Sequence, residues 1–246
     1  MIIPQYRGKI PAVNTPQMIE VDRAMIKDFH IELTQMMENA GRNLAYLARV
    51  RFMDGNAFGT NVMVMAGTGG NGGGALVCAR RLHNWGARVQ VVLTQAAEEF
   101  RPVPAHQLDI LRRIGVPIIP ANLIANITVI DLIIDGIIGY SLTGAPRDPA
   151  RNLIQWANRQ QAPILALDVP SGLDPTTGAI YDPTIRATAT MTLALPKEGL
   201  LAPVATANVG ELYLADISVP PALYTEPALA LEVGPLFAEN DIIRLR

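Results

Sequence analysis

The chain has 246 residues, half of them hydrophobic, and a formal net charge of −2. This is sufficient for one large α/β domain or two small ones, and the balanced charge excludes a global attraction to nucleic acid or to an anionic membrane. The single cysteine, Cys78, excludes an internal disulfide and a cysteine-based zinc site. The start MIIPQYRGKI has no signal-peptide core, and no uncharged apolar run reaches ~18 residues, the length of a membrane span.

We therefore expect a cytoplasmic protein with no membrane segment and no nucleic-acid partner. The alternative is an organellar protein whose transit segment lies outside this chain. The elements described next indicate a single domain over residues 1–246, with its core at about 15–220, an N-terminal arm at 1–13 and a C-terminal tail at 221–246. The tail, rich in Pro, Ala and Leu, is expected to pack on the body or on a partner.

The first helix is predicted to start after the arm. Asn14 or Thr15 can cap it, with Pro16 in its first turn. Asp22 falls on the apolar stripe of this helix, and we favour the interpretation that it satisfies a nearby backbone group over the alternative that it faces a site.

A second helix is predicted from about 32 to 53. Glu38 and Asn39 interrupt its apolar face and are interpreted as solvated. From residue 62 onward, apolar runs alternate with helical patterns, which predicts a parallel sheet covered on both faces. The expected strands are 62–66, 89–93, 129–134, 163–167, 189–195 and 211–215, and the expected helices are 74–85, 106–114 and one capped by Asp148 with Pro149 at its first position.

Six glycines lie between the first of these strands and the helix that follows it: Gly67, Gly69, Gly70, Gly72, Gly73 and Gly74. Glycine removes the Cβ that would keep a ligand away from the backbone. The helix N-terminus supplies free N–H groups and the positive end of the helix dipole. Strand, glycine loop and helix together predict an anion site, most simply for phosphate.

Two further strand ends carry unusual loops. Asp135 begins DGIIGYSLTGAPR, and Asp168 begins DVPSGLDPTTG, which contains Ser171. The carboxyl ends of parallel strands share one edge of a sheet, so both carboxylates are expected to converge with Asn71 of the glycine loop. Their oxygens could ligate a cation.

Several familiar sites do not fit this stretch. The glycine loop contains G-x-G-x-x-G, but no acid stands at the end of the next strand, as a dinucleotide site would need. No Lys-Ser or Lys-Thr pair follows the glycines, which excludes a Walker A loop. No histidine follows Ser171, which excludes the hydrolase order Ser, Asp, His.

Five motifs in order resemble the YjeF N-terminal domain family, the NAD(P)H-hydrate epimerases, which include apolipoprotein A-I-binding protein. They are MMENAG at 36–41, GTGGNGGGALVCARRL at 67–82, DGIIGYSLTG at 135–144, DVPSGLD at 168–174 and LPKEG at 195–199. The resemblance implies an α/β fold, a three-layer αβα sandwich with a Rossmann-like, mostly parallel sheet. It also implies interconversion of the R and S forms of hydrated NADH and NADPH in nicotinamide nucleotide repair, a homodimer, and a separate NAD(P)H-hydrate dehydratase in the same pathway.

The resemblance also implies the site residues. Asn71, Asp135 and Ser171 match three ligands of one potassium ion per subunit, and Asp168 matches a substrate-binding acid. The substrate-binding loops match Gly70, Asn71, Gly72, Gly73 and Gly74, and Gly139, Tyr140, Ser141, Leu142, Thr143, Gly144 and Ala145. For the chemistry we assign Asp168 as the catalytic group, because epimerisation needs one group that gives and takes a proton.

This chain departs from the family pattern at several positions. Gly70 replaces the family's first asparagine, Gly74 its aspartate and Ala75 its next glycine, and the bulky Tyr140 stands where the family keeps a small residue. Losing a carboxylate at Gly74 is expected to remove a substrate hydrogen bond or a titrating group. Two alternatives to the isomerase therefore stay open: a non-catalytic nucleotide-binding or dimerising scaffold, and an enzyme acting on another nucleotide or sugar phosphate.

Overall fold

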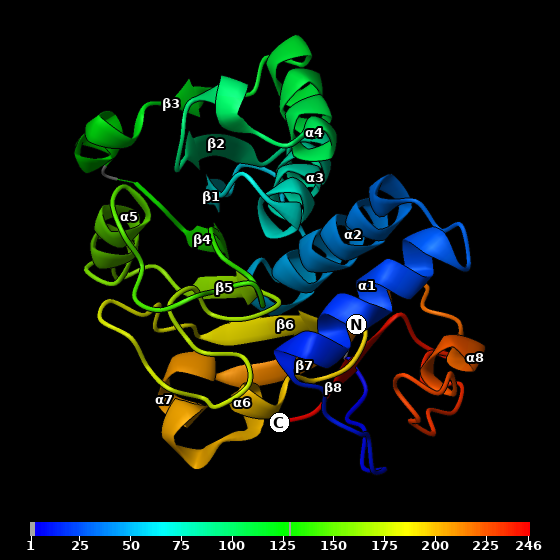
Figure 1. The fold of residues 1–246 in the computed structure, drawn as a ribbon. Helices are drawn as coiled ribbons and strands as arrows, with labels where there is room; N and C mark the ends of the chain where they lie inside the picture. The colour runs from blue at the N-terminus through cyan, green and yellow to red at the C-terminus, as the bar shows by residue number, and fades with distance from the viewer. Residues whose placement is uncertain (1–2, 128) are drawn as a thin grey trace.

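An eight-stranded sheet runs through the computed structural model, which describes residues 3–127 and 129–246 (Figure 1). The strand order is β3-β2-β1-β4-β5-β6-β7-β8, and every neighbouring pair is parallel except β7 with β8. The strands are β1 (Asn61–Ala66), β2 (Arg88–Leu93), β3 (Ile118–Ile119), β4 (Leu132–Gly136), β5 (Ile164–Leu167), β6 (Ala189–Leu193), β7 (Glu211–Ala215) and β8 (Ile242–Arg244).

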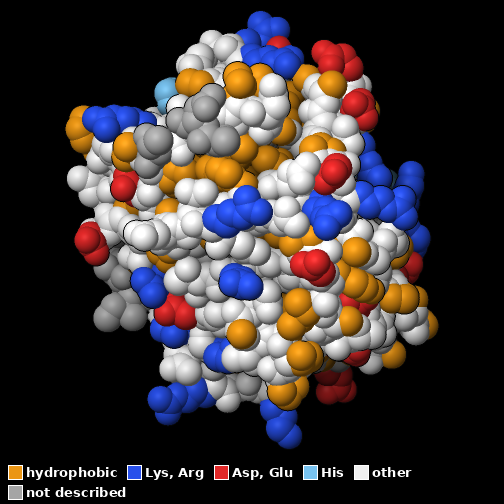
Figure 2. Space-filling model, turned by 90° about the vertical axis from the view of Figure 1, so that its left-hand side faces the viewer, with side chains coloured by type: hydrophobic (Ala, Val, Ile, Leu, Met, Phe, Trp, Pro, Cys, Tyr) orange, Lys and Arg blue, Asp and Glu red, His pale blue; other side chains and the backbone are white. Residues whose placement is uncertain are grey.

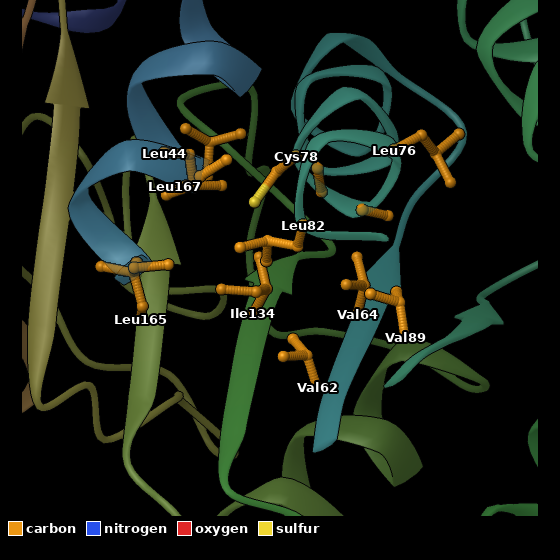
Figure 3. Close-up of a cluster of buried hydrophobic side chains, with 14 of the residues drawn as sticks. Leu44, Val62, Val64, Leu76, Cys78, Leu82, Val89, Ile134, Leu165 and Leu167 are labelled. Atoms are coloured by element: carbon orange, nitrogen blue, oxygen red, sulfur yellow. The ribbon is translucent and has the colours of Figure 1, made fainter. Parts of the chain in front are cut away.

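Alternating side chains of the strands enter two separate cores, as the pleat requires. Val62 and Val64 of β1 face one helical layer, in the same cluster as Leu82 and Ile134 (Figure 3). Met63 and Met65 face the opposite layer. Because the central strands are buried on both sides, they are continuous apolar runs, which is why the sequence reveals them.

Helices cover both faces of the sheet and make the three-layer αβα sandwich that the resemblance implies (Figure 1). One layer contains α2 (Leu33–Phe52), α3 (Gly70–Asn84) and α4 (Pro102–Arg113). The other contains α5 (Ala150–Ala157), α6 (Glu198–Leu201) and α7 (Thr206–Val209), with the 3-10 turns Ala121–Asn126 and Pro203–Ala205; a further turn, Ala97–Glu99, precedes α4.

The first two helices form where the sequence predicts them. α1 (Thr15–Lys27) has Asn14 as its N-cap in a capping box with Gln17. Glu38 of α2 is not simply solvated, because its carboxylate accepts hydrogen bonds from Arg80 of α3 at 2.6 Å and from Gln107 of α4 at 3.2 Å. This charge network joins the three helices α2, α3 and α4.

Two helices begin earlier than predicted. α3 starts at Gly70 rather than Gly74, so four of the six glycines are helical. α4 starts at Pro102 rather than His106, since proline is well tolerated in a first helical turn. α5 begins one residue late, at Ala150, with Pro149 as its N-cap. In α3, the low helix propensity of glycine is overridden by packing.

Other differences concern strand ends and the tail. β4 spans Leu132–Gly136 instead of 129–134, and β6 ends at Leu193 because Ala194 has a left-handed φ of 62°. The two-residue β3 has too little pattern to predict. β8 lies in the tail and pairs antiparallel with β7, and α8 (Pro221–Tyr224), also in the tail, packs against α1.

The N-terminal arm also lies on the body. Gln5 bridges to Arg244 of β8, and Val13 bridges to Lys197; residues 1–2 of the predicted arm lie outside the described residues. On the side of the molecule that carries α5, basic and acidic side chains are interspersed with apolar ones (Figure 2). No helix within the described part of the chain combines the length and apolarity that a membrane crossing requires.

Candidate functional site

A cavity of about 760 Å³ opens at the carboxyl ends of β1, β4, β5 and β6. The strand order reverses at β1, with β2 on one side and β4 on the other, and such a switch point leaves a crevice outside the strand ends. α1 and α2 supply the facing wall through Met18, Asp22 and Met36. The sequence does not predict this wall, because the rule that ligands bind at the carboxyl ends of parallel strands identifies only residues at the edge of the sheet.

Most of the residues predicted to bind substrate line this cavity: Gly70, Asn71, Gly139, Tyr140, Ser141, Leu142, Thr143, Ala145 and Asp168. Gly72, Gly73, Gly74 and Gly144 are not among the lining residues, and neither are Asp135 and Ser171, which are buried. The structure thus brings the three predicted loops together, but turns part of the glycine stretch away from the cavity.

Close packing explains the glycines that do not reach the cavity. A Cβ on Gly72 would lie 1.8 Å from the carbonyl oxygen of Gly67, and one on Gly73 would lie 2.6 Å from Sδ of Met37. These glycines let the start of α3 approach the end of β1 and the side of α2. The loop that exposes backbone to a ligand is therefore shorter than the sequence suggests and ends at Asn71.

Asp168 and Lys197 form an ion pair at the sheet side of the cavity. Nζ of Lys197 donates to Oδ1 of Asp168 at 2.5 Å, and also to the carbonyl oxygen of Leu193 at 2.8 Å and to Oγ1 of Thr192 at 3.3 Å. The lysine side chain is fully buried. A buried ammonium requires such partners, because an unpaired charge in the interior is costly.

Lys197 was not predicted as a site residue. It belongs to the LPKEG motif, and a lysine inside an otherwise apolar run is a signal that could have identified it. Asp168 has a left-handed φ of 66°, and its backbone N–H donates to the carbonyl of Met191 at 2.7 Å. Within the described residues all hydrogen bonds to the Asp168 carboxylate reach Oδ1, and Oδ2 accepts none. Oδ2 is thus the oxygen left for a ligand in the cavity.

Asp135 and Ser171 lie together beneath the cavity. The carboxylate of Asp135 accepts from Oγ of Ser171 at 2.7 Å, from N of Ser171 at 2.8 Å and from N of Ile137 at 3.2 Å. These donors are neutral, and burial raises the pKa of Asp135 to about 6. The sequence prediction that β4 and β5 bring these two residues together is consistent with these contacts.

Asn71 lies beside the residue that follows Asp135, since a Cβ on Gly136 would lie 3.3 Å from the carbonyl oxygen of Asn71. Its Nδ2 is buried and has no hydrogen-bond partner within the described residues. A Cβ on Gly139 would lie 3.3 Å from Oδ1 of Asn71, so the loop after β4 passes close to this side chain. A rotation of the amide by 180° exchanges nitrogen and oxygen, which would turn the unpartnered position into an oxygen ligand.

Among the described residues no backbone N–H donates to the Asp22 carboxylate, contrary to the interpretation favoured from the sequence. Its Oδ2 accepts a hydrogen bond from the Tyr140 hydroxyl, and both residues line the cavity. Burial raises the pKa of Asp22. Burial and the neighbouring Asp22 carboxylate also raise the pKa of Tyr140 above its usual range. The Tyr140 side chain is thus held by a partner on α1.

Two arginines at the cavity favour an anionic ligand. Arg101 and Arg147 line it, and within the described residues neither guanidinium makes a hydrogen bond or ion pair. The backbone N–H of Arg101 donates to the carbonyl of Thr68 at 3.3 Å, which places it beside the loop that leads into α3. The positive end of the α3 dipole and two free cations together suit a phosphorylated ligand.

The structure predicts that Gly74→Asp destabilises the fold. A Cβ on Gly74 would lie 2.9 Å from Cδ2 of Leu167 and 3.7 Å from Cβ of Ala40, inside the core. We expect Gly74→Asp to lower the free energy of unfolding by about 3 kcal/mol or more, because it buries an unpaired carboxylate in a filled space. Urea denaturation measures this change.

Gly74→Ala is the matched control for that substitution. Its crowding against the end of a flexible leucine is offset by a gain in helix propensity of about 1 kcal/mol, so we expect a change within about 1 kcal/mol of zero. An aspartate variant as stable as the alanine variant would contradict the placement of Gly74 in the core.

Comparison with known proteins identifies relatives of this chain. A protein of Dehalogenimonas lykanthroporepellens named NAD(P)H-hydrate epimerase is 40% identical over 96% of this chain and 93% of its own length. A protein of Salinibacter ruber named bifunctional NAD(P)H-hydrate repair enzyme Nnr is 36% identical over 86% of this chain, but only 41% of its own length is matched.

A crystal structure of the yeast protein ynu0 (YNL200c) covers 96% of this chain and all of its own, with a TM-score of 0.82 and 24% sequence identity, which supports the same fold. The family model described as YjeF-related protein N-terminus matches residues 33–199, which is more than half of the chain and includes all five motifs. The chain therefore belongs to the YjeF-related protein N-terminus family.

Proposed function

We propose that this protein is an NAD(P)H-hydrate epimerase, an isomerase that interconverts the R and S forms of hydrated NADH and NADPH. The observation that carries the proposal is the Asp168 carboxylate, with Oδ2 free at the cavity and Oδ1 held by Lys197, in a chain 40% identical to a protein with that name. The position of Gly74 outside the cavity lining also weakens the argument for a non-catalytic scaffold, since a carboxylate there would not face the ligand.

The residues of the cavity suit the parts of such a substrate. The anionic phosphates have Arg101, Arg147 and the N-terminus of α3 as partners. The ring has apolar neighbours in Met18 and Met36 of the facing wall. With the phosphates held at the glycine loop and the loop after β4, the hydrated ring points toward Asp168.

Epimerisation requires the hydroxyl of the hydrated carbon to leave and return on the other face, or the ring to open and close. Either route needs a group that gives and takes a proton. Oδ2 of Asp168 is that group in our proposal. Lys197 keeps the carboxylate in one orientation through Oδ1, and the anchored backbone of Asp168 prevents it from turning away.

We further propose one potassium ion per subunit, held by Asn71, Asp135 and Ser171. The residues fit such an ion: the Asp135 carboxylate is buried with neutral donors, and Asn71 has an unpartnered buried amide. Amide, carboxylate and hydroxyl oxygens suit hard cations. Within the described residues no three His, Cys, Asp or Glu side chains gather. Bound there, the ion would supply positive charge beside the phosphates and order the loops.

The decisive test is to incubate the protein with pure R-NADHX and follow the appearance of S-NADHX, in KCl and in choline chloride at equal ionic strength. We expect conversion above the uncatalysed rate, and faster conversion in KCl. No conversion in either salt would refute the epimerase, and equal rates would refute the potassium site. Binding of NADP⁺ without conversion would favour a scaffold.

The family resemblance also implies an oligomeric state, a location and a partner enzyme. We propose a homodimer, which light scattering after size exclusion would test, and a cytoplasmic location. We also propose that a separate NAD(P)H-hydrate dehydratase acts in the same pathway. The names of the bifunctional relatives support this link, since this chain matches 41% of the Salinibacter ruber protein.

A further inference from the structure

The hydrogen bond between Tyr140 and Asp22 crosses the wall of the cavity. Tyr140 lies in the loop after β4 and Asp22 lies on α1, 118 residues away in the chain. Both side chains line the same cavity as Asp168. The contact ties the loop after β4 to α1 inside the cavity, where a bound ligand would meet both side chains.

The two carboxylates of this cavity have different partners. Asp168 is paired with the buried ammonium of Lys197. Asp22 instead accepts its hydrogen bond from a neutral phenol, that of Tyr140. The charged groups that act on Asp22 are Lys197, which lowers its pKa, and Asp168, which raises it; Arg101 acts on Tyr140. Two carboxyl groups with such different partners can take different parts in a proton transfer, one as acid and one as base.

Epimerisation presents a problem that one carboxylate does not solve easily. A hydroxyl that leaves from one face of the ring and returns on the other needs proton transfer on both faces. Asp168 and Lys197 stand at the ends of the strands, whereas Asp22 belongs to the α1 wall. We propose that Tyr140 and Asp22 form the second proton-transfer pair of the reaction, acting from the α1 side while Asp168 acts from the sheet side; this rests on the proposed function.

Water is the co-reactant, because it leaves from one face of the ring and adds to the other. One pair donates a proton to the departing hydroxyl, the C–O bond breaks with its electrons on oxygen, and water leaves while the ring nitrogen lone pair forms a C=N bond. A water molecule then adds to the other face, its oxygen forms the new C–O bond, and the C=N electrons return to nitrogen. The other pair accepts the proton released, and proton exchange with water then returns both pairs to their starting states. In the reverse direction the two pairs exchange roles.

On the α1 side, the Tyr140 hydroxyl is the group that touches substrate, and Asp22 supplies or receives the proton through it. The test compares Asp22→Asn and Tyr140→Phe with wild type in R-to-S conversion, measuring kcat, KM and the pH profile of kcat/KM. Both replacements keep the shape of the side chain. Asp28→Asn is the matched control, because it makes the same chemical change at the exposed end of the same helix, where Asp28 pairs with Arg23.

We expect kcat to fall by about a hundredfold in each variant, within the range that general acid–base catalysis contributes, with KM within about threefold of wild type. In Asp22→Asn one limb of the pH profile is expected to disappear, since one of the two groups whose protonation the reaction requires no longer titrates. Asp28→Asn should behave as wild type.

Two results would overturn the second pair. One is kcat within about threefold of wild type in both variants, with both limbs of the profile retained. The other is a higher KM at unchanged kcat, which would assign the pair to binding alone. If wild type itself fails to convert R-NADHX, the proposed function fails with it, and this outcome is distinct because it appears before any variant is compared.

Discussion

Asp168→Asn is expected to lower kcat for R-to-S conversion by about a thousandfold, a loss typical of removing a group that transfers a proton in the transition state. The amide keeps the shape of the carboxyl group but cannot accept a proton at the position of Oδ2, which is the oxygen left free for a ligand. Initial rates with R-NADHX, corrected for uncatalysed epimerisation, measure the change.

Asp109→Asn is a matched control for this prediction. Asp109 makes an exposed ion pair with Arg113 on α4 and does not line the cavity, so its activity is expected to equal wild type. Unchanged turnover in Asp168→Asn, in protein that melts as a folded domain, would exclude the role that we assign to Asp168 and would move the chemistry elsewhere in the cavity.

Lys197→Met is expected to lower the free energy of unfolding by about 3–5 kcal/mol, because it leaves the Asp168 carboxylate buried without its counter-ion. The lysine side chain is fully buried and that of Asp168 is 5% exposed, so water replaces little of the lost interaction. Methionine fills a similar volume, which limits the contribution of a cavity. Urea denaturation at neutral pH measures the loss.

A double-mutant cycle with Asp168→Asn separates charge pairing from packing. Each single variant leaves one buried charge alone, whereas the double variant leaves none, so the double variant is expected to lose less than the sum of the two single losses. The difference should be about 1–3 kcal/mol. Additive losses would mean that the two groups do not stabilise one another in the folded protein.

Much of this molecule follows from local sequence pattern. The buried strands are apolar runs long enough to be found without a structure, and β7 matches its predicted residues. Asn14 and Pro16 identify the start of α1 because a helix N-terminus needs an acceptor for its free N–H groups and tolerates proline. The sequence also places Asp135 and Asp168 at one edge, because parallel strands end on the same side.

Tertiary structure alone decided which side chains meet. Lys197 reaches Asp168 from 29 residues away, and Tyr140 reaches Asp22 from 118 residues away. Periodicity reports which face of an element is buried, but not which residue of another element lies against it. For that reason the sequence assigned a backbone partner to Asp22 and no role to Lys197.

In the glycine stretch, too, the sequence predicts one property and the tertiary structure decides another. Its sequence correctly indicates that the backbone must come close to something after β1. At Gly69, Gly70 and Asn71 the chain lines the cavity, whereas at Gly72, Gly73 and Gly74 the close neighbours are the protein's own backbone and side chains. Glycine has no side chain to record which neighbour it accommodates, so composition predicts the close approach, and only the packing of α3 on the sheet and on α2 determines whether ligand or protein occupies the space.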